Sequence, residues 1–386
     1  MVPLSYTLRS LFVRKSGTFL TMSGIAATVA VVAGILALQQ GFQSLYASHG
    51  REDVAVFLRP GATYEGDSLF TRGRALKLTR GLPEVLEDEK GPLASMECYL
   101  ALLHPRLDGG ETNVPIRGVQ PASFRIRKDE LRIVEGRNFQ PGSDEVIVGE
   151  KLVGRIQGCE VGGVLELNLT PYKVVGVFAS DGPLASEIWG DLDRMLAGLD
   201  RIGPNRVVAS LKPEADLEDL AARLESDKEV PAKVLSEAEY LSGQTAALSF
   251  LLVALSAILG FLLSAAALLT ATTTMFAAVS SRTHEIGILL ASGFRPFSIF
   301  LAFLIEALLL GLGGGLLAAL LLLPLHGLET STTNFQTFTE VAFSFQITPL
   351  VLGVSIFFAS LLGTFGGALP AWRAARLLPT EALRRS

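Results

Sequence analysis

Four long stretches of the chain contain no Asp, Glu, Lys or Arg. They cover residues 16–50, 244–281, 307–328 and 341–372. A helix needs about 20 apolar residues to cross roughly 30 Å of hydrocarbon, and lipid forces its backbone groups to bond within the segment. The pattern therefore predicts four transmembrane helices, at residues 17–47, 244–279, 297–325 and 341–370.

The segment between the first two spans, residues 48–243, alternates short apolar runs with turn residues. Such runs are typical of strands, here Val54–Leu58, Val114–Val119, Glu145–Val148, Val164–Leu169 and Tyr172–Phe178. Its last third predicts a strand, a helix and a strand, over Val207–Leu211, Leu217–Leu224 and Val230–Leu235.

Both ends of this segment contribute to one predicted α/β subdomain. The first strand and a helical stretch near Leu76–Leu86 mirror the pattern of the last third. The β-rich middle, about residues 98–190, is then an insertion in that subdomain. The predicted fold class is membrane α-helical with four transmembrane helices, plus an α+β extracytoplasmic domain.

The first 16 residues place Leu4, Leu8, Leu11 and Phe12 on one helical stripe. This stripe predicts a cytoplasmic interfacial helix on the inner leaflet, and an early start of the first span explains it as well. The uncharged run that follows is far longer than the 7–15 apolar residues of a signal peptide. We interpret it as a retained signal anchor.

Basic residues near the span ends predict the orientation, because Lys and Arg resist export. They precede the first span, occur at Arg282 and Arg295 between the second and third, and follow the fourth. The loop at residues 326–340 contains no Lys or Arg. Both termini, the segment 280–296 and the tail 371–386 are therefore predicted to be cytoplasmic, and residues 48–243 and 326–340 extracytoplasmic.

Composition agrees with a membrane protein, with 49% hydrophobic residues, 18% charged residues and a mean hydropathy of +0.42. The whole chain has a net charge of −5. Residues 48–243 alone contain 24 Lys and Arg against 33 Asp and Glu, a net charge of −9. This negative charge argues against nucleic acid as a partner.

Several catalytic motifs are missing from the sequence. It contains no Gly-Lys dipeptide, so it has no phosphate-binding P-loop, and it lacks both H-E-x-x-H and G-x-S-x-G. Its four His and two Cys form no metal-ligand pattern. Cys98 and Cys159 fit a disulfide or two buried free thiols equally well. We therefore predict a non-catalytic chain with no metal site.

The cytoplasmic segment 280–296 is amphipathic. Ile286, Leu289, Leu290 and Phe294 fall near helical spacing, Arg282 and Glu285 lie in the first turn, and Gly293 can end the helix. Its apolar face needs cover, which either a groove on a partner protein or the inner leaflet can provide.

The motif R-x-x-E-I-G-x-L-x-A-x-G-F at Arg282–Phe294 resembles the FtsX-like permease family, as do Leu304–Ala307, Gly311–Gly315 and the tail Pro370–Arg384. Other motifs resemble a MacB-type periplasmic core domain: Arg117–Val119, Glu135–Arg137, Val146–Gly149, Val174–Val177 and Ser186–Asp191. These motifs extend over nearly the whole chain.

The resemblance implies a homodimer or heterodimer of permeases bound to two copies of a separate ABC ATPase, which binds ATP and Mg. A periplasmic adaptor is left open, and membrane lipids are further partners. The expected location is the bacterial cytoplasmic (inner) membrane. The implied ATPase-coupling residues are Arg282, Glu285, Ile286, Leu289, Leu290, Gly293 and Phe294.

The implied mechanism is mechanotransmission, in which ATP hydrolysis in the cytoplasm moves the extracytoplasmic domains. The predicted function is export or extraction of an amphiphile, such as a lipoprotein, a lipid or a hydrophobic drug. The alternative is a signal relay without transport that activates an extracytoplasmic cell-wall hydrolase.

Glu306 lies within the third span, and an ionisable side chain at that depth is a functional candidate. Helical rise places Thr272, Thr273 and Thr274 of the second span at the same level. Their hydroxyls are predicted to bind Glu306, either as a strut used in switching or as a purely structural contact.

Two further groups of spanning residues have open roles. Gly311, Gly313, Gly315, Gly363 and Gly367 favour close helix packing over gating. An apolar cleft between protomers or an interfacial aromatic belt explains the second group, Phe42, Leu45, Tyr46, Tyr240, Leu248 and Phe250.

Overall fold

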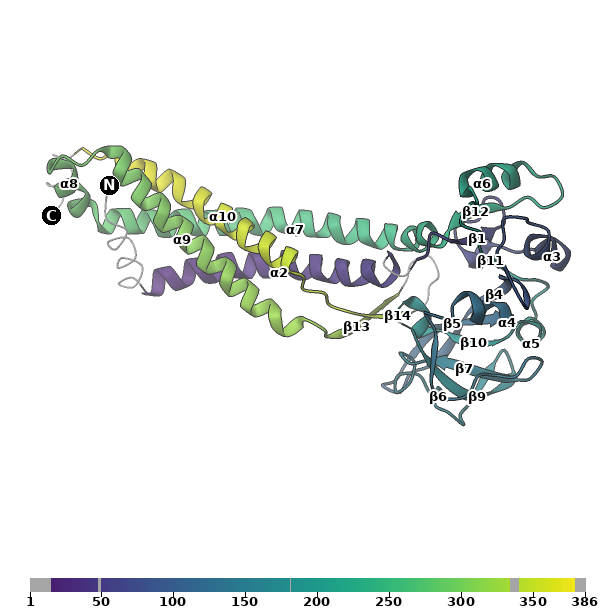
Figure 1. Ribbon diagram of the computed structural model, residues 1–386. Coiled ribbons are helices and arrows are strands. Elements are labelled where there is room, and N and C mark those ends of the chain that lie inside the picture. Colours follow the sequence, from purple (N-terminus) through teal and green to yellow (C-terminus); the bar gives the residue numbers. More distant parts are fainter. Residues whose placement is uncertain (1–14, 48–49, 181, 334–339, 379–386) are drawn as a thin grey trace. The chain divides into compact units, whose positions relative to one another are not determined.

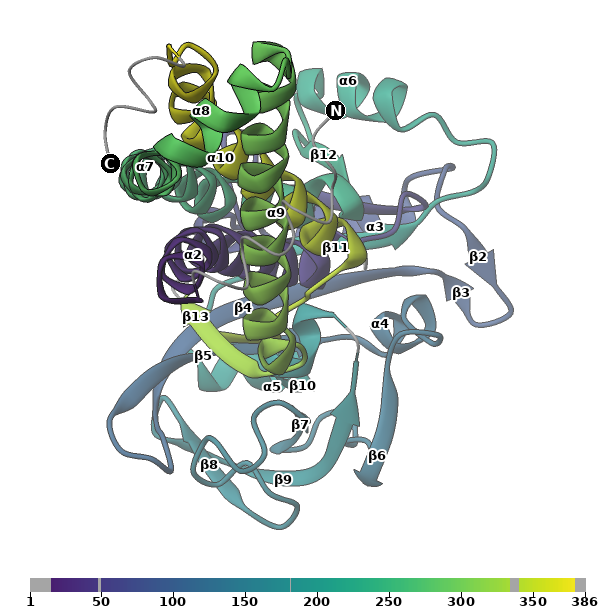
Figure 2. The same ribbon diagram turned by 90° about the vertical axis from the view of Figure 1, so that its left-hand side faces the viewer.

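The computed structural model describes residues 15–47, 50–180, 182–333 and 340–378 (Figures 1 and 2). The chain divides into two compact units. Among the described residues, the helical unit comprises 15–40, 250–328 and 344–378, and the α+β unit comprises those within 41–249 and 329–343. The predicted interfacial helix falls almost entirely on residues 1–14, outside the described residues, as does the end of the tail from residue 379.

Within the described residues, four helices are long and apolar enough to cross a membrane: α2 (Lys15–Ala47), α7 (Glu237–Ser281), α9 (Pro296–Leu322) and α10 (Pro349–Ala375). In the helical unit they lie side by side in both views (Figures 1 and 2). Their outward side chains include many large apolar residues, such as Phe261, Leu316 and Phe357. Exposed apolar side chains on this scale suit a lipid environment.

Glycines bring α9 and α10 into backbone contact. A Cβ atom at Gly363 would lie 2.5 Å from the carbonyl oxygen of Ala307 and 2.7 Å from the Cα of Gly311. A Cβ at Gly315 would lie 2.9 Å from the Cα of Ile356. These distances confirm the packing interpretation of the glycine spacing, because no larger residue fits at this depth of approach.

Two of the helices begin at other residues than predicted. Helix α7 begins at Glu237 instead of residue 244, because Ser236 and Glu239 form a capping box. The Ser236 hydroxyl accepts from the Glu239 N–H, and the Glu239 carboxylate accepts from the Ser236 N–H, both at 3.1 Å. Helix α10 begins at Pro349 instead of residue 341, with Thr348 as its N-cap.

Residues near the predicted 326–340 loop form strands. Strand β13 (Glu329–Thr333) pairs with β14 (Glu340–Ser344), the segment that the sequence assigned to the start of the fourth span. An uncharged run identifies an apolar segment but does not distinguish a strand from a helix, so this boundary was wrong.

The α+β unit contains a sheet of ten strands in the order β12-β1-β11-β4-β5-β10-β7-β9-β6, with β8 paired to β9. The strands are β1 (Val54–Leu58), β4 (Ala94–Pro105), β5 (Glu111–Val119), β6 (Arg132–Gly136), β7 (Glu145–Gly149), β8 (Val164–Leu167), β9 (Thr170–Ala179), β10 (Ile188–Asp191), β11 (Arg206–Ser210) and β12 (Lys233–Ser236). A small ribbon joins β2 (Glu87–Asp88) to β3 (Gly91–Pro92).

Strands from both ends of the segment lie together, as the sequence predicts: β1 pairs with β11 and with β12. The β-rich middle continues the same sheet through the long strand β4. Residues Ala94–Glu97 of β4 pair with β11, and residues Cys98–Pro105 pair with β5. Strand β4 therefore belongs to both halves of the unit.

Helices cover both faces of this sheet. Side chains of α3 (Arg72–Arg80), α5 (Leu192–Gly198) and α6 (Leu217–Ser226) share one core with alternate strand residues, whereas α4 (Pro121–Ile126) packs on the opposite face. The stretch predicted as helical near Leu76–Leu86 was misplaced, since α3 ends at Arg80, before Gly81.

Both cysteines are free and buried. They lie in the core shared by α3, α5 and α6. Burial raises the pKa of each thiol to about 12. Of the two interpretations that the sequence left open, the structure therefore has the buried free thiols.

Candidate functional site

A short helix, α8 (Thr283–Ala291), connects α7 to α9. It ends in a Schellman motif: the Gly293 N–H donates to the Leu290 carbonyl and the Phe294 N–H donates to the Leu289 carbonyl, both at 3.1 Å. Gly293 has φ +91°, which a residue with a side chain adopts only with strain. The predicted helical segment and its end at Gly293 are both present.

The apolar face of α8 packs mainly against the chain's own helices. Ile286 is 2% exposed and belongs to a core with Val279 of α7 and Phe303 of α9. Leu289 and Leu290 are half-buried against the same core. The prediction that Ile286 contacts a partner is therefore wrong, because a periodic apolar face shows only that something covers it.

Other side chains of α8 are accessible. Glu285 and His284 are exposed, and Ile288, about one turn further along the same side of the helix, is 48% exposed. Phe294 is half-buried. The exposed surface of α8 thus includes Glu285, His284 and Ile288, and sequence periodicity did not single out Ile288.

Arg282 and Glu306 form a buried ion pair. The Arg282 Nη1 donates to the Glu306 Oε2 at 3.1 Å, and the two side chains are 10% and 7% exposed. Arg282 is therefore a residue of the helix bundle and does not face a partner, contrary to its predicted coupling contact. Removing one member of a buried pair typically costs about 3–5 kcal/mol, because the other charge is left without compensation.

The three threonines have other partners than Glu306. Thr272 donates to the Gly366 carbonyl of α10 at 2.9 Å, and Thr273 donates to carbonyls of its own helix. Thr274 donates to its own helix and accepts from the Thr21 hydroxyl at 2.8 Å. The predicted hydroxyl strut to Glu306 is wrong, since a guanidinium is a stronger partner for a carboxylate than a hydroxyl.

The shared membrane level of Thr274 and Glu306 is nevertheless correct. Both lie at the edge of an open hollow of about 300 Å³ in the helical unit, which residues of α2, α7 and α9 line. Thr18 and Thr21 also line it, so one wall is polar.

The aromatic residues proposed for an open cleft are mostly buried inside one chain. Phe42 is fully buried against Tyr46 and Phe343, with ring centroids 5.3 and 5.5 Å apart. Tyr46, Tyr240 and Leu248 are also buried, Phe250 is 77% exposed, and the Leu45 side chain lies outside the described structure. These residues therefore do not form one exposed cleft.

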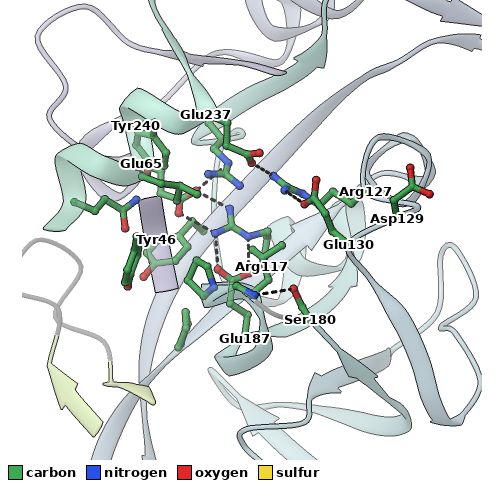
Figure 3. Close-up of a pocket in the computed structure, with 18 residues that line it drawn as sticks. Tyr46, Glu65, Arg117, Arg127, Asp129, Glu130, Ser180, Glu187, Glu237 and Tyr240 are labelled. Atoms are coloured by element: carbon green, nitrogen blue, oxygen red, sulfur yellow. Dashed lines mark hydrogen bonds and ion pairs between the residues drawn. The ribbon is translucent and has the colours of Figure 1, made fainter. Parts of the chain in front are cut away.

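The α+β unit contains a buried charge cluster that the sequence did not predict. We call it the Arg117 cluster, and it consists of Arg117, Arg206, Glu65, Glu97 and Glu187. Figure 3 shows Arg117 with Glu65 and Glu187. Sheet register assembles it: Glu97 of β4 lies opposite Arg206 of β11, and Arg117 of β5 lies between Tyr99 of β4 and Trp189 of β10.

Arg117 is the centre of the cluster. It donates two hydrogen bonds to Glu187, at 2.7 and 2.8 Å, and two to Glu65, at 2.6 and 2.8 Å. A further bond of 3.2 Å reaches Glu97, which also accepts from Arg206 at 2.7 and 2.9 Å. All five side chains are at most 8% exposed.

Two carboxylates of the cluster, those of Glu97 and Glu65, are held in the charged form. Burial alone opposes ionisation of Glu97, but Arg206 and Arg117 outweigh it and lower its pKa to about 2. The pKa of Glu65 is lowered in the same way, with Arg117 and Arg206 outweighing burial. The cluster thus joins β4, β5, β11 and the short 3-10 helix η1 (Glu65–Asp67) where β4 passes between the two halves of the sheet.

A signal for this cluster is present in the sequence. Glu97, Arg117 and Arg206 each lie in an apolar run with β character, where a solvated charge is out of place. Pairing them needs the strand order β11-β4-β5-β10, which single-sequence patterns do not provide.

Comparison with known proteins places the chain in a family. A model of the MacB-like periplasmic core domain matches residues 18–227, and a model of the FtsX-like permease C-terminal region matches residues 255–379. The chain belongs to the MacB- and FtsX-like permeases of ABC transporters.

Among individual relatives, the macrolide export ATP-binding/permease protein MacB of Shewanella oneidensis is 26% identical over 99% of this chain. The chain spans 60% of the length of that relative. The uncharacterized ABC transporter permease YknZ of Bacillus subtilis is 25% identical over 98% of this chain and 97% of its own length. The solved extracellular domain of a YknZ transporter from Gram-positive bacteria is 17% identical, with a TM-score of 0.35 over 47% of this chain and 99% of the domain.

Proposed function

We propose that this chain is a permease subunit that couples ATP hydrolysis by a separate ABC ATPase to export or extraction of an amphiphile. Two copies of the ATPase bind ATP and Mg in the cytoplasm, and a second permease subunit completes the complex. The α+β unit lies outside the inner membrane, with both termini in the cytoplasm. Family membership supports this assignment.

The observation that carries the proposal is the construction of α8. Its inner face is fixed to the bundle through Ile286 and through the Arg282–Glu306 pair, while Glu285 and Ile288 remain on its surface. A force on α8 therefore reaches α7 and α9 directly. Ile288 is the apolar contact that we assign to the ATPase.

The test is co-purification of the tagged chain from its native host, with Mg-ATP hydrolysis as the readout. Ile288→Asp places a charge on the contact and should abolish both ATPase association and hydrolysis, because a buried anchor typically contributes at least about 2 kcal/mol to binding. Ile202→Asp is the matched control, since Ile202 is 87% exposed in the α+β unit, outside the membrane-spanning helices. Normal ATPase binding by Ile288→Asp would remove the coupling role of α8.

Export itself needs a second measurement. The complex in liposomes should release a labelled amphiphile from the bilayer to an acceptor only when ATP is supplied. ATP turnover without release of any amphiphile would favour the relay function over export.

Orientation is tested by labelling with a membrane-impermeant thiol reagent. Glu111→Cys in β5 should react from outside intact cells, whereas Ile288→Cys should react only after the membrane is opened, because basic residues flank α8. The native thiols do not interfere, because Cys98 and Cys159 are buried. Labelling of Ile288→Cys from outside would overturn the proposed topology.

A further inference from the structure

A pocket opens beside the Arg117 cluster in the α+β unit (Figure 3). Its volume is about 130 Å³, below the roughly 300–1,000 Å³ of pockets that enclose a drug-sized ligand. It therefore has room for one small group of a few non-hydrogen atoms. Its apolar lining includes Pro115, Leu184 and Leu241.

Acidic side chains outnumber basic ones in the lining of this pocket. Three guanidinium groups, those of Arg117, Arg127 and Arg206, face five carboxylates. The carboxylates are those of Glu65, Asp129, Glu130, Glu187 and Glu237. The described lining therefore has a net charge of −2, which favours a cationic ligand.

Arg127 has hydrogen-bonding capacity that the protein leaves unused. Its side chain is 3% exposed and lies between Glu237 and Glu130 (Figure 3). It donates to the Glu237 Oε1 at 2.5 Å and to the Glu130 Oε2 at 3.1 Å. Its Nε–H, however, is buried with no hydrogen-bond partner.

Each of the two carboxylates also has one oxygen atom without a hydrogen bond. The Glu237 Oε2 is buried without a hydrogen bond, in a side chain that is 4% exposed. The Glu130 Oε1 accepts no hydrogen bond either, and its contact with the Arg51 Nη1 at 3.6 Å is an ion pair only. Buried polar atoms in native proteins nearly always have partners, so one unused donor and two unused acceptors around one guanidinium point to a missing ligand.

We propose that this pocket binds a protonated amine with an oxygen atom beside it, as in an amino alcohol. The ammonium N–H groups donate to Glu237 and Glu130, and the ligand oxygen accepts from the Nε–H of Arg127. The positive charge offsets the acidic lining. Two sources present this chemistry, a free amino alcohol and the ethanolamine headgroup of a phospholipid.

The pocket is also placed to affect α7. Glu237 is the first residue of that helix, and Leu241 and Gln244 of the same helix line the pocket. A ligand that binds Glu237 therefore acts on the end of α7 that lies in the α+β unit. Binding does not require the ATPase, so this inference is tested separately from the proposed function.

The experiment titrates ethanolamine onto the full-length chain in detergent, by calorimetry or by ligand-observed NMR. Four non-hydrogen atoms limit the dissociation constant to no tighter than about 40 µM, and we expect a value between that limit and the millimolar range. Ethylamine, which lacks the oxygen, should bind at least about 5-fold more weakly. Ethylene glycol, which lacks the charge, should not bind.

Variants identify the site. Glu237→Gln should weaken ethanolamine at least about 10-fold, whereas Glu229→Gln should not, because Glu229 is an exposed carboxylate of the same unit outside the pocket. Should Glu237→Gln fail to fold, Asp129→Asn serves instead: this side chain is exposed, and its loss of charge should weaken the amine about 3-fold.

The source is decided by competition. If vesicles of phosphatidylethanolamine displace ethanolamine and vesicles of phosphatidylcholine do not, the ligand is the lipid headgroup. Phosphatidylcholine is the control because its quaternary nitrogen has no N–H donors. Displacement by neither identifies a free amino alcohol. The proposal is overturned if ethanolamine does not bind at tens of millimolar, if ethylene glycol binds equally well, or if Glu237→Gln and wild type bind it alike.

Discussion

Replacing Arg117 with Met tests whether the Arg117 cluster stabilises the α+β unit. The substitution keeps a long side chain but removes the cation that donates to three carboxylates. Glu187 would then lose its two hydrogen bonds from Arg117, whereas Glu65 and Glu97 would keep Arg206 beside them, and all three carboxylates are buried. Leaving buried charges uncompensated typically costs about 3–5 kcal/mol, so the unfolding equilibrium constant should rise about 150- to 5,000-fold.

The assay uses a probe that the cluster itself provides. Trp189 is fully buried, and its indole N–H donates to the Glu187 Oε2 at 2.7 Å. In a Trp372→Phe background, Trp189 is the only tryptophan of the chain. Its fluorescence then reports denaturant unfolding of the α+β unit within the full chain in detergent.

The matched control is Arg137→Met. Arg137 also bonds a carboxylate, that of Glu145 at 2.5 Å, but it is 51% exposed. An exposed pair contributes at most about 1 kcal/mol. Our reasoning would be refuted if Arg117→Met destabilised the unit no more than this control, because the buried carboxylates would then not depend on the cation.

Three further predictions follow from packing and charge. Gly363→Val should destabilise the helical unit by about 1–3 kcal/mol or more, whereas Gly353→Val on the same helix should not. Of these two sites, only Gly363 lacks room for a Cβ atom, and thermal melting of both variants in detergent tests the difference. The pKa of Glu97 is lowered from its ordinary 4.5 to about 2, so its ionised form contributes up to about 3 kcal/mol to the stability of the folded unit. This contribution is present in full above about pH 4.5 and should be lost as the pH falls toward 2, which Trp189 fluorescence can measure. Cys98 and Cys159 should resist maleimide at pH 8 until the chain is denatured, because burial raises the pKa of both thiols to about 12.

The spanning helices were predictable because a water-free medium excludes charged side chains over a fixed length. The ends of these helices were less predictable, because the length of an uncharged stretch does not reveal which capping residues begin or end the helix. The Ser236-x-x-Glu239 pattern was visible in the sequence and would have moved the start of α7 to its observed place. The start of α10 was missed because an apolar strand, β14, precedes it.

The candidate sites were predicted as sets of residues, but their partners were not. The α8 pattern showed that Ile286 needed cover, but not that the chain's own helices supply it. Glu306 was identified by its depth, yet its partner Arg282 was assigned to another role. Partner choice depends on how helices are rotated against one another, and this is tertiary information.

The glycine contact between α9 and α10 restricts how these two helices can evolve. In an ordinary core, a larger side chain on one element can be offset by a smaller one opposite. At Gly363 and Gly311 both positions already have the smallest residue there is, and their backbones touch. A larger residue on either helix therefore cannot be offset by a smaller residue on the other, so we expect these two positions to remain glycine. In the core of the α+β unit, by contrast, paired substitutions that keep the total volume are possible.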